Sequence, residues 1–108
     1  MRRSWEIRGY ENDKGIRPFE AWISTLSEAT RIRVEERLDR LTYGNFGDHK
    51  AVGKGVYEPR LFFGPGYRIY YAISGKRIVL LLAGGDKKSQ SKDIRKAQSY
   101  WNQYQSEQ

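Results

Sequence analysis

The stretch VYEPRLFFGPGYRIYYAISGKRIVLLLA, residues 56–83, decides the fold of this 108-residue chain. It contains three runs rich in β-branched and aromatic residues, which the breakers GPG at 64–66 and SGK at 74–76 separate. This pattern predicts three consecutive strands joined by tight turns, at about 56–63, 67–74 and 77–83. The run over residues 78–83 is apolar throughout but too short to span a membrane, so we interpret it as a central strand covered on both faces.

The N-terminal segment predicts a strand followed by two helices. Apolar residues alternate with charged ones over residues 5–9, which is the period of a half-buried strand. Pro18 suits the first turn of a helix, and an apolar stripe at i, i+3, i+4 and i+7 starts at Phe19. Ser27 can cap a second helix that runs to about Tyr43. We expect the two helices to form a helical hairpin.

A loop and a C-terminal helix account for the other segments. Four glycines interrupt residues 44–55, so we expect a loop there. We interpret Gly84 and Gly85 as the turn between the last strand and a final helix, which Ser91 can cap. The order β-α-α-β-β-β-α predicts one α+β domain over residues 1–108, an antiparallel sheet of about four strands packed against the helical hairpin and the C-terminal helix.

The positive charge of the chain is concentrated in its second half. The chain has 20 Lys and Arg against 13 Asp and Glu, a net charge of +7. Residues 1–46 hold nine basic and eight acidic side chains, whereas residues 47–108 hold eleven and five. Such a field suggests an anionic partner such as nucleic acid, although it is equally compatible with a surface that only keeps the protein soluble. Interleaved aromatic residues favour nucleic acid because bases stack on their rings; they are Tyr57, Phe62, Phe63, Tyr67, Tyr70 and Tyr71.

The composition disfavours several classes of protein. There is no cysteine, so disulfides and cysteine-based metal or nucleophile sites are excluded. The single histidine, His49, lies in the glycine-rich loop and is interpreted as a surface residue; we expect no metal and no small-molecule cofactor. No apolar run could cross a membrane and the N-terminus has no apolar stretch typical of a signal peptide, so we expect a cytoplasmic protein with no membrane partner.

Basic residues near the strand ends form a candidate phosphate site. Arg60 and Arg68 lie on strands joined by a tight turn, so their guanidinium groups can converge on one face of the sheet. A planar guanidinium can hold two phosphoryl oxygens at once. The plainer alternative is that Arg68 pairs with Glu58 or Asp86 and that the loop lysines are solvated charges. The whole basic set is Lys50, Lys54, Arg60, Arg68, Lys87 and Lys88.

A site of this kind can cleave RNA without a metal. The 2′-hydroxyl of RNA attacks the adjacent phosphate if the protein aligns the reacting oxygens, stabilises the charge on the phosphorane and assists two proton transfers. No residue is an obvious general base, but a lysine crowded by other cations, Asp93 or a tyrosine could share the proton transfer. Tyr70 and Tyr71 point to opposite faces of their strand, so we expect one in the core and the other near the cleft.

Five motifs carry a family resemblance that extends from about residue 5 to residue 102. They are FxxW at 19–22, GNFGD at 44–48, VYExR at 56–60, GPGYRxYY at 64–71 and GGDKxxQxxDIxxA at 84–97. With them the chain resembles the RelE/ParE superfamily of bacterial toxins, specifically the phage-derived, HigB-like branch of addiction module killer proteins. The combination of the fourth and fifth motifs is the most specific part of this resemblance.

The resemblance implies a small α+β toxin of a type II toxin–antitoxin system. Such a toxin cleaves mRNA, often on the ribosome, and a cognate antitoxin with a helix-turn-helix DNA-binding domain silences it. By position, the resemblance implies that Arg60 and Arg68 grip the scissile phosphate, that Lys87 is a further cation, and that Asp93 stands where relatives place a tyrosine or an acid. The residues then expected to contact RNA are Lys50, Lys54, Lys88 and Tyr70.

Two other functions stay open from the sequence. One is a non-enzymatic inhibitor like the ParE side of the superfamily, which binds a DNA topoisomerase. The other is an RNA- or ribosome-binding module whose cations position a backbone without cutting it.

One residue departs from the family pattern. Pro59 stands where the branch usually has leucine. Because proline removes a ladder donor, it belongs on an edge strand or at a bulge. We therefore expect Pro59→Leu to raise stability or toxicity.

Overall fold

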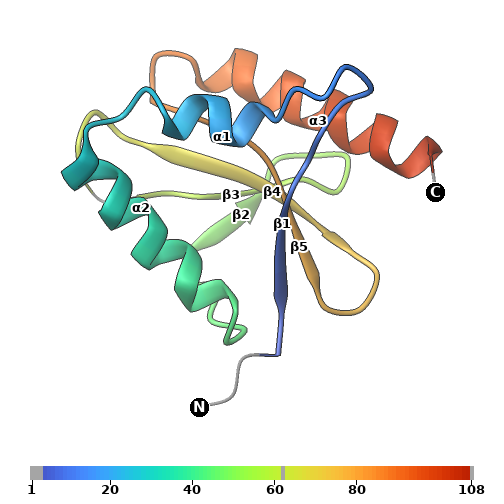
Figure 1. Cartoon of the computed structure of the whole chain (residues 1–108), viewed down its shortest axis with the longest axis horizontal. Helices are drawn as coiled ribbons and strands as arrows, with labels where there is room; N and C mark the ends of the chain where they lie inside the picture. The colour runs from blue at the N-terminus through green and yellow to red at the C-terminus, as the bar shows by residue number, and fades with distance from the viewer. Residues whose placement is uncertain (1–3, 62, 108) are drawn as a thin grey trace.

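The computed structural model describes residues 4–61 and 63–107, which form a five-stranded sheet and three helices (Figure 1). In chain order the elements are β1 (Glu6–Gly9), α1 (Pro18–Ile23), α2 (Glu28–Leu41), β2 (His49–Ala51), β3 (Tyr57–Pro59), β4 (Arg68–Ser74), β5 (Ile78–Gly85) and α3 (Gln90–Ser106). The α+β class is confirmed, and β2 is one strand more than the sequence predicted. Phe62, one of the aromatics expected beside the basic residues, lies outside the described residues.

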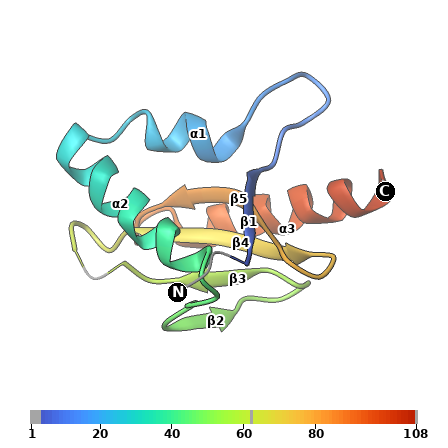
Figure 2. The same cartoon turned by 60° about the horizontal axis from the view of Figure 1, so that its bottom comes forward.

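The sheet is mixed, with strand order β1-β5-β4-β3-β2. β2, β3, β4 and β5 pair antiparallel, whereas β1 runs parallel to β5. The prediction of an antiparallel sheet of about four strands is therefore wrong in strand number and in the direction of β1. A short turn forces the two strands that it joins to be antiparallel. Because α1 and α2 separate β1 from the other strands in the sequence, no local turn fixes the direction of β1. Figure 2 shows β2 at the outer edge of the sheet, beyond β3.

β2 lies within the segment that the sequence predicted to be a loop. Its first residue, His49, pairs with Pro59 of β3. The strand predicted over 56–63 is shorter, because β3 ends at Pro59 and only an isolated bridge between Arg60 and Arg68 follows. Proline has no N–H to donate, which explains the early end of the ladder. Because β2 pairs with β3, β3 is an internal strand and Pro59 is its last residue. The expectation that Pro59 lies on an edge strand is therefore wrong.

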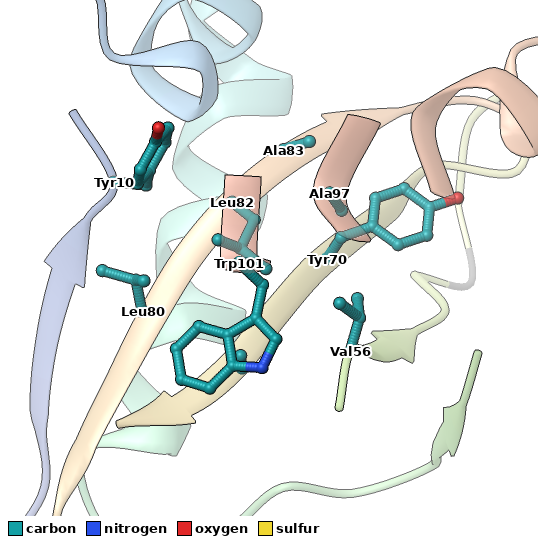
Figure 3. Packing of buried hydrophobic residues seen from close by; sticks show 9 residues of the cluster. Tyr10, Val56, Tyr70, Leu80, Leu82, Ala83, Ala97 and Trp101 are labelled. Atoms are coloured by element: carbon teal, nitrogen blue, oxygen red, sulfur yellow. The ribbon is translucent and has the colours of Figure 1, made fainter. Parts of the chain in front are cut away.

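β4 and β5 form the centre of the sheet, and helices cover both of its faces. Residues 68–72 of β4 and 79–83 of β5 are buried, which confirms the prediction of a central strand covered on both sides. On one face, Ala97 and Trp101 of α3 pack with Tyr70, Leu80 and Leu82 (Figure 3). On the other face, α1 and α2 bury their apolar stripes, represented by Phe19, Val34 and Leu41.

The helix ends follow the predicted caps in α1 and α2 but not in α3. Pro18 is the first residue of α1, and the Ser27 side chain accepts a hydrogen bond from the Thr30 N–H at 3.2 Å at the start of α2. The residue that precedes α3 is Ser89, whereas the predicted cap Ser91 is exposed inside the helix. The predicted buried stripe of α3 is confirmed by the burial of Ala97 and Trp101 and the partial burial of Ile94.

Gly84 and Gly85 belong to β5 and are not the turn that the sequence predicted. A Cβ atom at Gly84 would lie 2.1 Å from Cε3 of Trp22, and one at Gly85 would lie 1.9 Å from Oδ2 of Asp93. Neither glycine has a positive φ angle. Close approach of α1 and α3 to the end of β5, not turn geometry, therefore requires the two glycines.

Candidate functional site

Arg60 and Arg68 lie opposite each other across the bridge that follows β3. Directly opposed residues of an antiparallel pair point to the same face of a sheet. Arg68 alternates with Tyr70 along β4, so this is the face that α3 covers. The register therefore sets the two arginines opposite each other, but the exposed Arg60 side chain lines cavities with residues of α2 and β2, whereas Arg68 is 5% exposed.

Arg68 is held from two sides inside the protein. Its Nη1 donates a hydrogen bond to the Gly66 carbonyl oxygen at 2.7 Å. Its Nε lies 3.7 Å from Oε2 of Glu58, and no group in the described part of the chain accepts a hydrogen bond from this buried nitrogen. Of the two pairings that the sequence left open for Arg68, the one with Glu58 is present. Its positive charge is therefore partly balanced by an internal carboxylate.

Glu58 is the centre of a polar cluster that we call the Glu58 cluster: Glu58, Lys50, Arg68 and Gln90. Glu58 is only 2% exposed. Its Oε2 accepts a hydrogen bond from Gln90 Nε2 at 3.0 Å, and its Oε1 lies 3.8 Å from Nζ of the exposed Lys50. From the sequence, Glu58 was expected only as a possible ion-pair partner of Arg68. Its acidic charge within a basic stretch, on a strand next to two arginines, was the signal that could have placed it in the site.

Tyr70 does not reach the surface. Its side chain is fully buried among Val56, Ala97 and Trp101, and Figure 3 shows its hydroxyl pointing away from the Trp101 ring. Burial, and next the neighbouring Glu58 carboxylate, raise the pKa of the Tyr70 hydroxyl. A base cannot stack on a ring inside the core, so we no longer assign RNA binding to Tyr70. Its neighbour Tyr71 is fully buried on the other face, so neither tyrosine lies at the cleft expected from the sequence.

The turn from β5 to α3 carries Lys87 and Lys88, and Lys87 lies beside the 64–66 turn. The Lys87 N–H lies 3.4 Å from the Pro65 carbonyl oxygen, and its side chain leaves the backbone next to Gly66. The Asp86 carboxylate accepts the N–H of Lys88 at 2.9 Å, which fixes the turn. Both lysine side chains are exposed. Lys87 therefore lies next to the turn that carries Arg68, as the sequence predicted.

Asp93 is a largely buried acid on the first turns of α3. Its Oδ2 accepts a hydrogen bond from the Ser89 hydroxyl at 2.5 Å. It packs against Gly85, which is the ladder partner of Arg68 on β4. Asp93 is therefore on the same face of the sheet as Arg68, with the half-buried Ser89 as its hydrogen-bond partner.

Lys54 is separate from the other predicted residues. It sits in the turn between β2 and β3 with a φ angle of 58°. It lines a cavity beside α3 with Arg95 and Gln98, near the middle of that helix. Its charge therefore lies at the opposite end of the β2–β3 hairpin from Arg60.

The sequence missed the role of His49 in the structure. It lines a cavity of about 210 Å³ with Lys50, Glu58 and Arg60. Its ring stacks on Tyr57 with 4.9 Å between ring centroids, and its Nδ1 is hydrogen-bonded to the Tyr71 hydroxyl. Burial, and next the positive charge of Arg37, lower the pKa of His49. The neutral imidazole is therefore the favoured form at neutral pH, and the residue is not the free surface histidine that the sequence suggested.

Two further findings concern the described residues as a set. They contain no group of three or more His, Asp or Glu side chains that could hold a metal ion. None of their helices is both long enough and apolar enough to cross a membrane.

Comparison with known proteins adds one relative. A protein of Haemophilus influenzae, described only as an uncharacterized protein, is 42% identical to this chain over 80 residues. The match covers 73% of this chain and 81% of that protein. No family model matches the chain.

Proposed function

The chain belongs to the same family as the uncharacterized Haemophilus influenzae protein, and we propose that it is an mRNA endoribonuclease, the toxin of a type II toxin–antitoxin system. The relative's description names no activity, so support for the proposal comes from the side chains around β3 and β4. The observation that carries it is the pairing of Arg60 with Arg68 at the ends of these strands.

The charges around this pair suit a phosphate of RNA. Arg60, Lys50 and Lys87 are exposed cations, and they surround a buried pair of opposite charges, Arg68 and Glu58. Fixed cations stabilise the charge that develops on a phosphorane, since they need no rearrangement during the reaction. In this proposal Arg60 and Lys87 contact the phosphoryl oxygens. Arg68, tied to Gly66 and Glu58, contributes a positive charge that is already in place.

The proton transfers need a group that can change its protonation state. We assign the proton acceptor to Asp93, whose carboxylate shares the Arg68 face of the sheet. Ser89 donates a hydrogen bond to Asp93 and is half-buried, so its hydroxyl links the acid to the surface of the β5–α3 turn. The RNA itself supplies the attacking 2′-hydroxyl, so the proposed reaction needs no metal and no small-molecule cofactor.

The proposal includes the partners that such a toxin requires. They are mRNA on the ribosome in the cytoplasm and a cognate helix-turn-helix antitoxin, which a neighbouring gene would encode. Lys50 and Lys88 are then backbone contacts of the RNA, because both are exposed next to the site. Lys54 is a weaker candidate, since it lies at the far end of the β2–β3 hairpin.

The test compares Arg60→Gln with Lys76→Gln, which removes the same charge from the exposed β4–β5 turn. Each variant is expressed beside the wild type while growth is followed and mRNA 5′ ends are mapped within minutes. The purified proteins are also incubated with RNA in the presence of a metal chelator. We expect the wild type and Lys76→Gln to cut RNA in both assays, and Arg60→Gln to lose at least tenfold in rate. Growth arrest without new 5′ ends, and no cleavage of purified RNA, would refute the ribonuclease and favour a ParE-like inhibitor.

One observation favours a second function, RNA or ribosome binding without cleavage. Arg68 is buried and already paired with Glu58, so fewer of its donors are free for a reacting phosphate. The same experiment separates the two functions. A pure binding module would retain RNA affinity that depends on Arg60 but would leave every RNA intact.

A further inference from the structure

A second group of arginines lies on the other side of Arg60. A cavity of about 420 Å³ is bounded by α2 and by the chain that follows β3. Its charged lining consists of Arg33, Glu36, Arg37 and Arg40 of α2, with Asp48 and Arg60. We call this cavity the arginine pocket.

The arginines of the pocket are not neutralised by the acids beside them. Glu36 stands at helical spacing from both Arg33 and Arg40, where ion pairs often form. Yet among the described residues no carboxylate lies within 4.0 Å of a nitrogen of these arginines, or of Arg37 or Arg60. Within the described part of the chain these four arginines therefore have no carboxylate partner, although the Arg33 guanidinium stacks on the Phe63 ring at 4.0 Å. With two acids against four arginines, the net charge of the lining is positive.

Arg37 is fixed in an orientation that leaves part of its guanidinium free. Its Nη2 donates a hydrogen bond to the Phe46 carbonyl oxygen at 2.8 Å. The same atom packs against Gly47, where a Cβ would lie only 2.7 Å away. Burial, and next the neighbouring Arg40, lower the pKa of Arg37. The Arg37 side chain is thus already ordered before any ligand binds, so binding does not have to supply the cost of ordering it.

The GNFGD motif at residues 44–48 explains how this orientation is set. Phe46 packs edge-on against Trp5, with 5.0 Å between the ring centroids, and this contact anchors the loop. Gly47 has a φ angle of 59°, which favours glycine, and it has no side chain to displace Arg37. Of this motif, only Asp48 also lines the cavity that holds Lys50 and Glu58. The geometry of the motif serves the arginine pocket.

The arginine pocket is continuous with the proposed RNA site. Arg60 and Asp48 line both this pocket and the smaller cavity that holds Lys50 and Glu58. A ligand whose negative charges repeat along a chain could therefore occupy both cavities across Arg60. Planar guanidinium forks bind phosphate with two hydrogen bonds each, which suits arginine for a nucleic-acid backbone.

We propose that the arginine pocket binds a second backbone phosphate of the RNA strand whose scissile phosphate lies at Arg60 and Lys87. This inference rests on the proposed function, because it extends the same RNA strand beyond that site. It names Arg33, Arg37 and Arg40 as positioning residues that hold the strand. The occupant is single-stranded RNA, and the contact is with its backbone and not with its bases.

The experiment measures binding of labelled 2′-O-methyl oligoribonucleotides of three and eight nucleotides, which cannot undergo attack by the 2′-hydroxyl. The variant is Arg33→Gln/Arg40→Gln, since both side chains are exposed; Arg33 also stacks on the Phe63 ring, so the stability of this variant is measured as well. The control is Lys14→Gln/Lys76→Gln, which removes two charges from exposed turns elsewhere. Thermal unfolding of every protein checks that the fold is retained.

We expect the pocket variant to weaken binding of the eight-nucleotide strand by about 10-fold to 100-fold and to reduce its salt dependence by roughly one phosphate contact. Binding of the three-nucleotide strand should change no more than in the control, whereas Lys87→Gln should weaken binding of both strands. If Lys87→Gln weakens both and the pocket variant matches the control, the second phosphate site is refuted while the RNA site stands. If the wild type binds neither strand, the proposed function and this inference both fail. If hexaglutamate binds the wild type but not the pocket variant, and RNA binding is unchanged, the pocket takes an acidic protein segment and the RNA inference is overturned.

Discussion

The buried pair of Glu58 and Arg68 leads to a quantitative prediction about stability. Glu58→Gln keeps an acceptor for Gln90 but removes the negative charge that faces Arg68. At 3.7 Å, two unit charges attract each other by about 4 kcal/mol if the effective dielectric constant is roughly 20. Burying a neutral glutamine costs less desolvation free energy than burying a charged glutamate, and this difference offsets part of the lost attraction. We therefore expect the free energy of unfolding to fall by about 2–3 kcal/mol.

A double-mutant cycle isolates the interaction from the rest of the change. Arg68→Met removes the cation and leaves Glu58 with the hydrogen bond from Gln90 and, as a charged partner, the exposed Lys50. The combination Glu58→Gln/Arg68→Met leaves no uncompensated buried charge. It should therefore be more stable than the sum of the single changes predicts, by roughly 2 kcal/mol.

Urea unfolding followed by tryptophan fluorescence measures all four proteins, since the chain has three tryptophans. Glu36→Gln, a substitution of an exposed acid, is the matched control and should change stability by no more than about 0.5 kcal/mol. If the two single changes add within about 0.5 kcal/mol, the internal pairing of Arg68 contributes nothing and the reasoning is wrong.

Three further predictions follow from other parts of the structure. Burial and Arg37 lower the pKa of His49 in the folded protein, so the unfolded chain binds a proton at His49 more readily and the free energy of unfolding should fall as the pH drops below about 6.5. Urea unfolding at pH 5 and pH 7.5 should show a smaller pH dependence for His49→Gln than for the wild type, and an equal dependence would contradict this prediction. Gly84→Ala should lower the free energy of unfolding by about 1–3 kcal/mol because its Cβ meets the Trp22 ring, and Trp22→Leu in the same chain should recover part of the loss; absence of any recovery would exclude this clash as the cause. Pro59→Leu restores a backbone donor at the end of β3 and should raise the midpoint of urea unfolding or the toxicity, whereas equal behaviour of the two forms would show that the donor is not missed.

Local signals in the sequence were sufficient for most elements of the fold. Turn residues at 64–66 and 74–76, together with the apolar run at 78–83, predicted the central β4–β5 hairpin, because short connections leave the chain few alternatives. The cap at Ser27 and the stripe ending at Trp101 likewise predicted α2 and the buried face of α3. The parallel direction of β1 depends on a partner distant in the chain, which no short pattern indicates. β2 pairs with the nearby β3 but was missed because the glycines around it predicted a loop.

The candidate site was only partly predictable for a similar reason. The opposition of Arg60 and Arg68 followed from the hairpin, and so did the placement of Lys87 near its turn. Burial could not be inferred at Tyr70 and Arg68, because whether α3 covers the end of β4 depends on packing across the sheet. The three arginines of α2 could not be assigned to a cavity from the sequence, because the cavity forms only where the loop at 44–48 packs beside the helix.

The parallel pairing of β1 with β5 has a consequence for the order in which the protein is completed. Glu6 pairs with Ile78, 72 residues later in the chain. During synthesis β1 must therefore wait, unpaired, until β5 has been made 72 residues later. The β4–β5 hairpin can form from local contacts, while β1 joins only after a long loop has closed. Docking of β1 is thus expected to be a late folding event, so that the sheet reaches its final form only after β5 is in place.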